Sequence, residues 1–255
     1  MGIEIISVGS PAPWYTKVAP PVVRGLEGWF NFDTDISRVG FNRVEGKADG
    51  VIVGAPVVAA AYATFTGLSA FVQTAITESI EQTVILVSRA NTTIPGGASV
   101  FGDANTPMHA GTYEGASANS TYPGTVPGAA VYQTEQTTTT FMASRRNAGD
   151  TATTGDVLSL TGETATNWGL RVLRTSSGAG NKLNNLTLGS VVTSTLISLR
   201  IPTTNTWRIG SGYTGFAGPV DVSQCIIFST LLTDEEIAAL AVPIRARAAR
   251  LGITV

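Results

Sequence analysis

Short apolar segments that alternate with a period of two recur along most of this chain. Thr, Val, Ile and aromatic residues dominate them, and clusters of Gly, Pro, Asn or Ser separate them. The clearest segments are 64–76, 83–89, 131–146, 167–175, 191–201 and 219–228. A period of two is typical of β-strands, and many short strands with turns between them indicate a sandwich or a barrel. We therefore expect an all-β fold.

The pattern also predicts which side chains share a face. Segment 83–89, TVILVSR, is nearly continuous in apolar residues and predicts a strand covered on both faces. The expected apolar faces elsewhere are Trp168, Leu170 and Val172; Ile197, Leu199 and Ile201; and Val220, Val222, Ile226 and Phe228. We read the apolar stretch 51–65 as loop and buried strand, because Gly54 and Pro56 interrupt it.

One helix is expected, over 233–252. Thr233 and Glu236 have the spacing of a capping box, in which each side chain binds the other residue's backbone N–H. Leu232 and Ile237 flank the cap at the spacing of a hydrophobic staple. The acidic residues in the first turn therefore serve the helix start and are not a catalytic cluster.

The second half of this helix carries a proline and several arginines. Pro243 is expected to interrupt it after about three turns. Arg245, Arg247 and Arg250 form a basic stripe, which we interpret as a solvated face.

The chain divides into a Pro-rich arm, 1–25, and one β domain, 26–255. Trp14 and Tyr15 lie in the arm and are expected to pack either on their own domain or on a neighbouring subunit. Within the domain, 91–130 is rich in Gly, Pro, Asn and Ser and predicts a long loop, with one short strand near 99–101. A loop of this length in a compact domain is usually functional or mobile.

Charge and composition exclude several classes of partner. The formal net charge is −2, so nothing indicates binding to nucleic acid or to acidic lipid. Cys225 is the one cysteine and His109 the one histidine, which excludes a disulfide framework and cysteine-based zinc sites. No signal peptide and no membrane insertion are expected.

Both ends of the domain resemble laminin-G-like, concanavalin A-like lectin domains. The opening GLEGWFNFD and the stretches TFTGLSAFVQT and TVILVSR resemble their first strands. The closing block shares Ile209-Gly210, glycines at 215 and 218, a long strand, and Leu232-Thr233-x-x-Glu236. The resemblance covers 26–89 and 205–240.

This resemblance implies a jelly-roll sandwich of two antiparallel sheets. Many such domains bind glycans or proteins, and a large group occurs in bacteriophage tail, fibre and other virion proteins. The chain departs from the family at Ser223-Gln224, where an Asp-Glu pair is common, and at Ser88, where Trp is common. The missing acids place in doubt any metal or acid–base role for the closing strand.

Paired carboxylates for glycoside hydrolysis are not evident. Two carboxyl groups must face one sugar at roughly 5–10 Å. Glu78 and Glu81 are expected on opposite faces of a strand, and Glu135 stands alone. Asp33 and Asp35 have the right spacing, and they are also candidate ligands for calcium, although turn chemistry is the preferred explanation for them.

The predicted long loop holds the best candidate glycan site. Its polar and aromatic members are Asp103, Asn105, His109, Tyr113, Glu114 and Tyr122. The alternative is that the tyrosines fasten the loop to the sandwich or to another subunit.

Together these features predict a non-enzymatic virion component of a phage tail, fibre or decoration layer, made in the host cytoplasm. It would attach to partner subunits, to a host-surface glycan or to both, without a cofactor. A homo-oligomer is expected, and a trimer would suit a fibre. The alternatives are a glycan-processing enzyme and a cellular carbohydrate-binding module.

Overall fold

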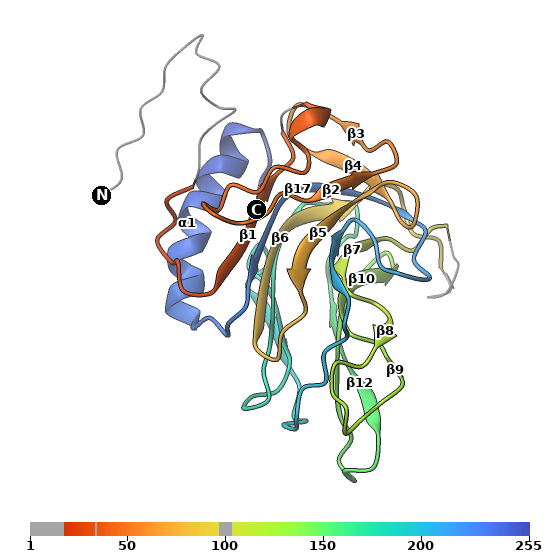
Figure 1. Ribbon diagram of the computed structural model, residues 1–255. Coiled ribbons are helices and arrows are strands. Elements are labelled where there is room, and N and C mark those ends of the chain that lie inside the picture. The colour runs from red at the N-terminus through yellow and green to blue at the C-terminus, as the bar shows by residue number, and fades with distance from the viewer. Residues whose placement is uncertain (1–17, 34, 97–103) are drawn as a thin grey trace.

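Two antiparallel sheets face each other in a computed structural model, which describes residues 18–33, 35–96 and 104–255 (Figure 1). Sheet A has the order β15-β14-β13-β6-β17-β4-β3, with β1 also paired to β17. Sheet B has the order β12-β11-β10-β7-β16-β5-β2, and β8 pairs with β9 in a small third sheet. The expected all-β sandwich is confirmed.

The elements have the following bounds. Sheet A contains β1 (Leu26–Asn31), β3 (Val57–Val58), β4 (Ala63–Thr66), β6 (Gln82–Ala90), β13 (Gly169–Thr175), β14 (Lys182–Asn185), β15 (Ser190–Thr193) and β17 (Pro219–Phe228). Sheet B contains β2 (Val51–Val53), β5 (Phe71–Thr77), β7 (Met108–Gly111), β10 (Ala129–Glu135), β11 (Thr138–Arg146), β12 (Thr153–Thr161) and β16 (Thr206–Ile209). The others are β8 (Gly115–Ala116), β9 (Thr125–Val126), the short 3₁₀ helix η2 (Ile36–Arg38) and α1 (Asp234–Arg250).

The central strands of sheet A, β6, β13 and β17, are buried on both faces. The inner face of sheet A meets sheet B in a core that includes Val84 and Leu86 of β6. Its outer face lies against α1, and there Ile85 and Val87 of the same strand join the apolar side of the helix (Figure 1). The continuous apolar run of β6 is thus explained, because alternate side chains fill two different cores.

A β-bulge in β17 corrects one predicted face. Val220 and Val222 lie in the core between the sheets, but Ile226 and Phe228 lie in the core under α1. The pairing with β6 shifts register between Val222 and Gln224. The extra residue at the bulge, Ser223, moves every later side chain to the opposite face. The expected face of β13 is confirmed, because Leu170 and Val172 lie in the core under α1 and Trp168 packs against it.

Two segments predicted as single strands each contain two strands. Segment 64–76 forms β4 of sheet A and β5 of sheet B, and Leu68 at the turn between them has a φ of 64°. Segment 131–146 forms β10 and β11, which pair with each other. The period of two continues through such short turns, so the pattern alone does not show where the chain reverses.

The predicted face of 191–201 is wrong. Only β15, Ser190–Thr193, is a strand, and the rest of the segment is irregular. The polar Ser198 and Arg200 are buried, whereas Ile197 is 65% exposed. Burial of the two polar side chains is possible because both make hydrogen bonds to neighbouring backbone carbonyls.

The predicted long loop 91–130 contains strands. It includes β7, β8 and β9 and the start of β10, so the described part is not one continuous loop. The expected strand near 99–101 lies outside the described residues.

Helix α1 begins as predicted and does not break at the proline. The Thr233 side chain accepts from the Glu236 backbone N–H at 3.2 Å, and Glu236 accepts from the Thr233 backbone N–H at 2.8 Å. Pro243 lies on the exposed face, while Leu240 and Ile244 hold the helix to sheet A. The helix therefore continues through Pro243, because packing offsets the missing hydrogen bond.

Arg247 does not belong to a solvated stripe. It is buried, and its guanidinium donates to Ser223 Oγ at 3.1 Å and pairs with Asp33 at 2.9 Å. Arg245 and Arg250 are exposed, as expected.

The end of the arm packs on its own domain. Val22 is buried in the core under α1, and Arg24 pairs with Glu236 at 2.8 Å. Trp14 and Tyr15 lie outside the described residues. No helix in the described ranges has the length and apolar character that a membrane span requires.

Candidate functional site

A cavity of about 470 Å³ lies at the end of three neighbouring strands of sheet A. Its wall comes from the end of β6, from the connections β12–β13 and β14–β15, and from the segment after α1. The lining residues are Arg89, Gly162, Glu163, Thr164, Thr166, Asn167, Trp168, Asn185, Thr187, Leu188, Gly252 and Thr254. The wall thus combines one aromatic ring with hydroxyl, amide and charged groups.

The connection from β12 to β13 is held by backbone hydrogen bonds. Ala165 donates its N–H to the Gln136 carbonyl at 2.7 Å and accepts from the Ala90 N–H at 2.8 Å. Ala165 is fully buried beside Ala90 and Ile94. This anchor leaves the polar residues on both sides of it, Thr164 among them, in the cavity wall.

The connection from β14 to β15 is held by the side chain of Asn185. Its Oδ1 accepts from the backbone N–H groups of Thr187 and Leu188, at 3.0 and 3.2 Å. Asn commonly fastens turns by such contacts. Both connections that line the cavity are therefore ordered by hydrogen bonds within the chain.

Trp168 has an aromatic and cationic environment. Its ring centroid lies 5.4 Å from that of Tyr62, and the Arg89 guanidinium lies 4.8 Å from the Trp168 centroid and 5.3 Å from the Tyr62 centroid. Arg89 also pairs with Asp221 of β17 at 2.9 Å. These contacts fix the orientation of Trp168, which remains partly exposed in the cavity wall.

Glu163 is the carboxylate of the cavity wall. Its Oε2 accepts from Arg171 at 2.7 Å and from the Asn185 side-chain amide at 2.9 Å. The side chain is only 5% exposed. Its Oε1 has no hydrogen-bond partner in the part of the chain that the structure describes.

Ser88, His109 and Gln133 form a buried chain that resembles a catalytic triad in its geometry. His109 Nδ1 lies 2.8 Å from Ser88 Oγ, and Nε2 lies 3.0 Å from Gln133 Oε1. Because Gln133 offers an acceptor there, Nε2 carries the proton and Ser88 donates to Nδ1. Burial, together with the charge of Arg171, lowers the pKa of His109 to about 3.

A catalytic role for this chain of three is not supported. All three side chains are fully buried, so no substrate reaches the Ser88 hydroxyl. The group instead joins β6 of sheet A to β7 and β10 of sheet B. It is a buried polar contact between the two sheets.

Of the six predicted glycan-binding residues, the five that the structure describes do not form one exposed surface. His109 and Tyr113 are buried, so neither provides an exposed binding group. Burial also raises the pKa of Tyr113 to about 12. Tyr113 packs edge-on against Phe216, with ring centroids 5.2 Å apart, so the alternative of a tyrosine fastened to the sandwich holds for this residue.

Of the remaining four, three are described by the structure, and each has a different environment. Asn105 is exposed in a turn, and the side chain of Glu114 is partly exposed. Tyr122 donates to Asp150 from the next hairpin. Asp103 lies outside the described residues.

The calcium candidates have protein partners instead. Asp33 pairs with Arg247, and Asp35 caps η2 by accepting from the Ser37 backbone N–H at 2.8 Å. No three His, Cys, Asp or Glu side chains in the described part of the chain are placed to share a metal ion. Turn and ion-pair chemistry therefore accounts for both aspartates.

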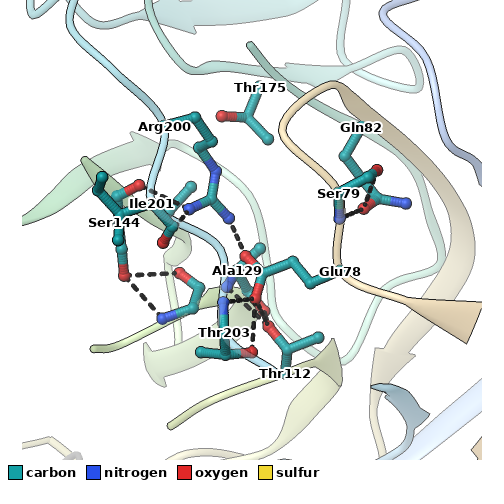
Figure 2. A network of polar contacts seen from close by, with 12 residues as sticks. Glu78, Ser79, Gln82, Thr112, Ala129, Ser144, Thr175, Arg200, Ile201 and Thr203 are labelled. Atoms are coloured by element: carbon teal, nitrogen blue, oxygen red, sulfur yellow. Dashed lines mark hydrogen bonds and ion pairs between the residues drawn. The ribbon is translucent and has the colours of Figure 1, made fainter. Parts of the chain in front are cut away.

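Glu78 is buried at the centre of a second polar network, so its carboxylate is not exposed for binding (Figure 2). It pairs with Arg200 and accepts from the Thr203 N–H and the Thr112 hydroxyl, both at 2.8 Å. Arg200 also donates to the Ser144 carbonyl at 2.6 Å. These contacts hold the irregular segment 194–205 against sheet B.

Comparison with known proteins identifies the architecture. No protein-family model and no curated protein matches the chain. The binding domain of botulinum neurotoxin D aligns with 87% of the chain at a TM-score of 0.58 and 10% identity. The binding domain of neurotoxin DC aligns with 86% of the chain at a TM-score of 0.57 and 8% identity. Trypanosoma rangeli sialidase aligns with 91% of the chain at a TM-score of 0.53 and 12% identity. The shared feature is the fold.

The chain spans about half the length of the neurotoxin domains, covering 52% of each, and 37% of the sialidase. The predicted two-sheet sandwich is thus confirmed by independent structures. None of these structures is described as a bacteriophage protein, so the virion part of the sequence resemblance stays a prediction.

Sequence reasoning missed the cavity at Trp168. The period of two predicts Trp168 on the apolar face of its strand, and none of the motifs considered above includes Glu163. The sequence TGETATNW, residues 161–168, contains a pattern that could have indicated the site. Turn-forming and amide residues there lead directly to a tryptophan at the start of a predicted strand. The contributions of Arg89 and Asn185 carried no such signal, because pairing between distant strands brings them there.

Proposed function

We propose that this chain is a non-enzymatic glycan-binding β-sandwich and that the cavity at Trp168 is its binding site. The observation that carries the proposal is a partly exposed tryptophan in a cavity wall otherwise made largely of hydroxyl, amide and charged groups. Binding sites for small molecules combine concave shape and apolar surface with a few placed polar groups. A sugar ring presents both an apolar face and several hydroxyls, so it suits such a wall.

A second cavity is less suited to this role. It has a volume of about 280 Å³ and is lined by Glu27, Lys47, Ala48, Ala75, Ile76, Thr77, Ser79 and Ser229. It contains no aromatic ring, and Glu27 and Lys47 pair with each other at 2.6 Å.

The proteins that share the fold support a glycan as the ligand class. The neurotoxin DC domain is described in complex with SialylT, and neurotoxin C is described as entering cells through two ganglioside molecules. The sialidase is described in complex with sialic acid. These are properties of those proteins, and at their low identity they support the proposal only through the architecture.

The cavity wall also favours binding over hydrolysis. Glycosidases of the common types place two carboxyl groups around one sugar bond. Glu163 is the one carboxylate in this wall, and it is already held by Arg171 and Asn185. A screen of polysaccharides for reducing ends would contradict the proposal if it detected turnover that Glu163→Gln abolished.

A glycan array followed by calorimetry tests the binding site. Trp168→Ala and Asn167→Ala should each weaken binding roughly tenfold, which corresponds to about 1.4 kcal/mol. Tyr122→Ala, at the glycan site that the sequence predicts in 91–130, is the matched control and should bind as the wild type does. The reverse pattern, with binding lost only in Tyr122→Ala, would move the site to that loop.

We also propose that the chain is a homo-oligomeric virion component of the phage tail or fibre type. The sequence resemblance of the closing block supports this. Exposed apolar side chains on the edge strands, Val51 and Val57 on one side and Val157 and Val191 on the other, support contact with other subunits. Immunolabelling of purified particles and light scattering of the isolated protein test it, and absence from particles would contradict it.

A further inference from the structure

Arg89 is the cationic side chain of the cavity wall, and the protein uses only part of its guanidinium. Its Nε donates to Asp221 at 2.9 Å. A guanidinium is planar and also carries N–H donors on its two Nη atoms. Within residues 18–33, 35–96 and 104–255, the Nη atoms of Arg89 make no hydrogen bond. This end of the guanidinium is therefore left for a ligand.

Solvent reaches this end of Arg89. The side chain is 30% exposed, and neither Nη belongs to the enclosed polar atoms that lack a partner in the described part of the chain. The guanidinium carbon lies 4.8 Å from the ring centroid of Trp168, which is itself partly exposed in the cavity wall. The unused donors thus lie beside the aromatic ring that we propose as the sugar platform.

The buried carboxylate of Asp221 does not need the Nη groups. Its Oδ2 accepts from Arg89 Nε, and its Oδ1 accepts from the Thr64 hydroxyl at 2.7 Å and from the Asn91 side-chain amide at 2.8 Å. A second carboxylate can therefore bind the Nη end of Arg89 while Asp221 keeps its contact with Nε. No buried charge loses its partner in that arrangement.

The carboxylate of the cavity wall does not oppose this. Glu163 is only 5% exposed, and its Oε2 accepts from Arg171 at 2.7 Å and from the Asn185 side-chain amide at 2.9 Å. The buried charge of Arg171 offsets that of Glu163. Because Arg89 is far more exposed than Glu163, the charge that a ligand meets in this cavity is the positive one.

We propose that the glycan is acidic, and that a carboxylate on the sugar ring at Trp168 accepts hydrogen bonds from the Nη groups of Arg89. This inference rests on the proposed function and specifies its ligand class. A guanidinium binds a carboxylate through two parallel N–H···O bonds, and such charge-assisted bonds are roughly twice as strong as neutral ones. Uronic acids and sialic acids are sugars with a carboxylate attached to the ring.

A glycan array in which each uronic-acid and sialic-acid oligosaccharide stands beside its methyl ester tests the proposal on wild-type protein. The ester keeps the shape of the sugar and removes its charge. By calorimetry the free acid should bind roughly tenfold more tightly than its ester. This preference should shrink as the salt concentration rises, because the contact lies in a partly exposed wall. Sulfated oligosaccharides on the same array report whether any anion suffices.

Arg89→Lys tests the role of the guanidinium. Lysine keeps a positive charge for the buried Asp221, but it cannot offer two parallel donors to a carboxylate. The variant should lose most of the preference for the acid over the ester. Arg24→Lys is the matched control, because Arg24 also pairs with a carboxylate, Glu236, and does not line the cavity. It should keep the wild-type preference.

The outcomes separate the two proposals. Equal binding of acid and ester by wild-type protein, lost in Trp168→Ala, would overturn the inference and leave the proposed site intact. Absence of binding across the whole array would overturn the proposed function and the inference with it. Sulfated sugars that bind as tightly as the acids would overturn the assignment to a carboxylate. A full preference for the acid in a folded Arg89→Lys variant would overturn the role of the Arg89 guanidinium.

Discussion

At the scale of one residue, His109 is a polar side chain that is fully buried with both ring nitrogens hydrogen-bonded. Its two ring nitrogens find Ser88 and Gln133, and Gln133 in turn donates to Thr139 at 3.0 Å. A residue that the sequence offered as a surface binding group is therefore part of the interior. Cys225 is the opposite case, because it lies within the apolar segment 219–228 and is buried there, and burial raises the pKa of its thiol.

The buried His109 should make stability depend on pH. Its pKa is about 3 in the folded chain and about 6.5 when exposed in the unfolded chain, so below pH 6.5 the unfolded chain binds a proton that the folded chain does not. The free energy of unfolding should therefore fall as pH falls from 6.5 toward 3. Urea unfolding at pH 7.5 and pH 5 should differ by about 2 kcal/mol from this group alone.

The chain has one histidine, so His109→Gln is a clean control for this window. The variant should be less stable at pH 7.5, but its stability should change much less between pH 7.5 and pH 5. An unchanged slope in the variant would show that His109 is not buried in its neutral form.

At the scale of an element, α1 combines a strong start with an internal defect. The N-terminus of α1 carries the capping box, the Arg24–Glu236 pair and three acidic residues. The negative charges of the acidic residues interact favourably with the helix dipole. Pro243 removes one backbone hydrogen bond on the solvent side. The helix persists because its apolar side covers the outer face of sheet A.

The capping box can be tested by replacing its first residue. Thr233→Ala removes the acceptor for the Glu236 backbone N–H and should lower the free energy of unfolding by about 1 kcal/mol. Thr233→Ser retains the hydroxyl and should stay close to wild type. Chemical denaturation monitored by circular dichroism distinguishes the two, and equal losses would argue against the cap.

Replacing the proline should stabilise the protein. Pro243→Ala restores a backbone donor within an exposed turn of α1, and we expect a gain of about 1–3 kcal/mol, reduced by the added entropy of the unfolded chain. Val242→Ala, at the adjacent position, which is also exposed, should change stability by no more than about 0.5 kcal/mol. A loss of stability in Pro243→Ala would indicate that the proline has a packing role.

At the scale of the whole molecule, buried polar networks join segments that are distant in the sequence. Arg145, Arg171 and Arg200 are all buried, and each binds carbonyl or carboxylate groups from other elements. The Glu78–Arg200 network is the clearest case, since it fastens an irregular segment to sheet B (Figure 2). Such pairs stabilise the fold only when both partners are present.

The Glu78–Arg200 pair predicts strong coupling between two mutations. Glu78→Gln or Arg200→Met alone should lower the free energy of unfolding by about 3–5 kcal/mol, because each leaves a buried charge without its partner. The double variant should lose clearly less than the sum of the two. A thermodynamic cycle from urea unfolding measures this, and additive losses would show that the pair is not energetically coupled.

Local patterns in the sequence determined the all-β class, the burial of β6 on both faces and the start of α1. These follow from side-chain period and capping chemistry, which act over a few neighbouring residues. The same local rules failed at Ile197 and Arg200, where the apolar residue is exposed and the charged one is buried. They failed again after the bulge at Ser223 in β17.

Only the tertiary structure decided where the candidate site lies. Arg89, Glu163, Trp168 and Asn185 come from the ends of strands that become neighbours through long-range pairing. The buried partners of His109 and Arg200 are likewise supplied by other elements, so burial of these polar residues cannot be read from their own neighbours. Period and caps are properties of short segments, whereas a cavity and a satisfied buried charge are properties of the packed chain.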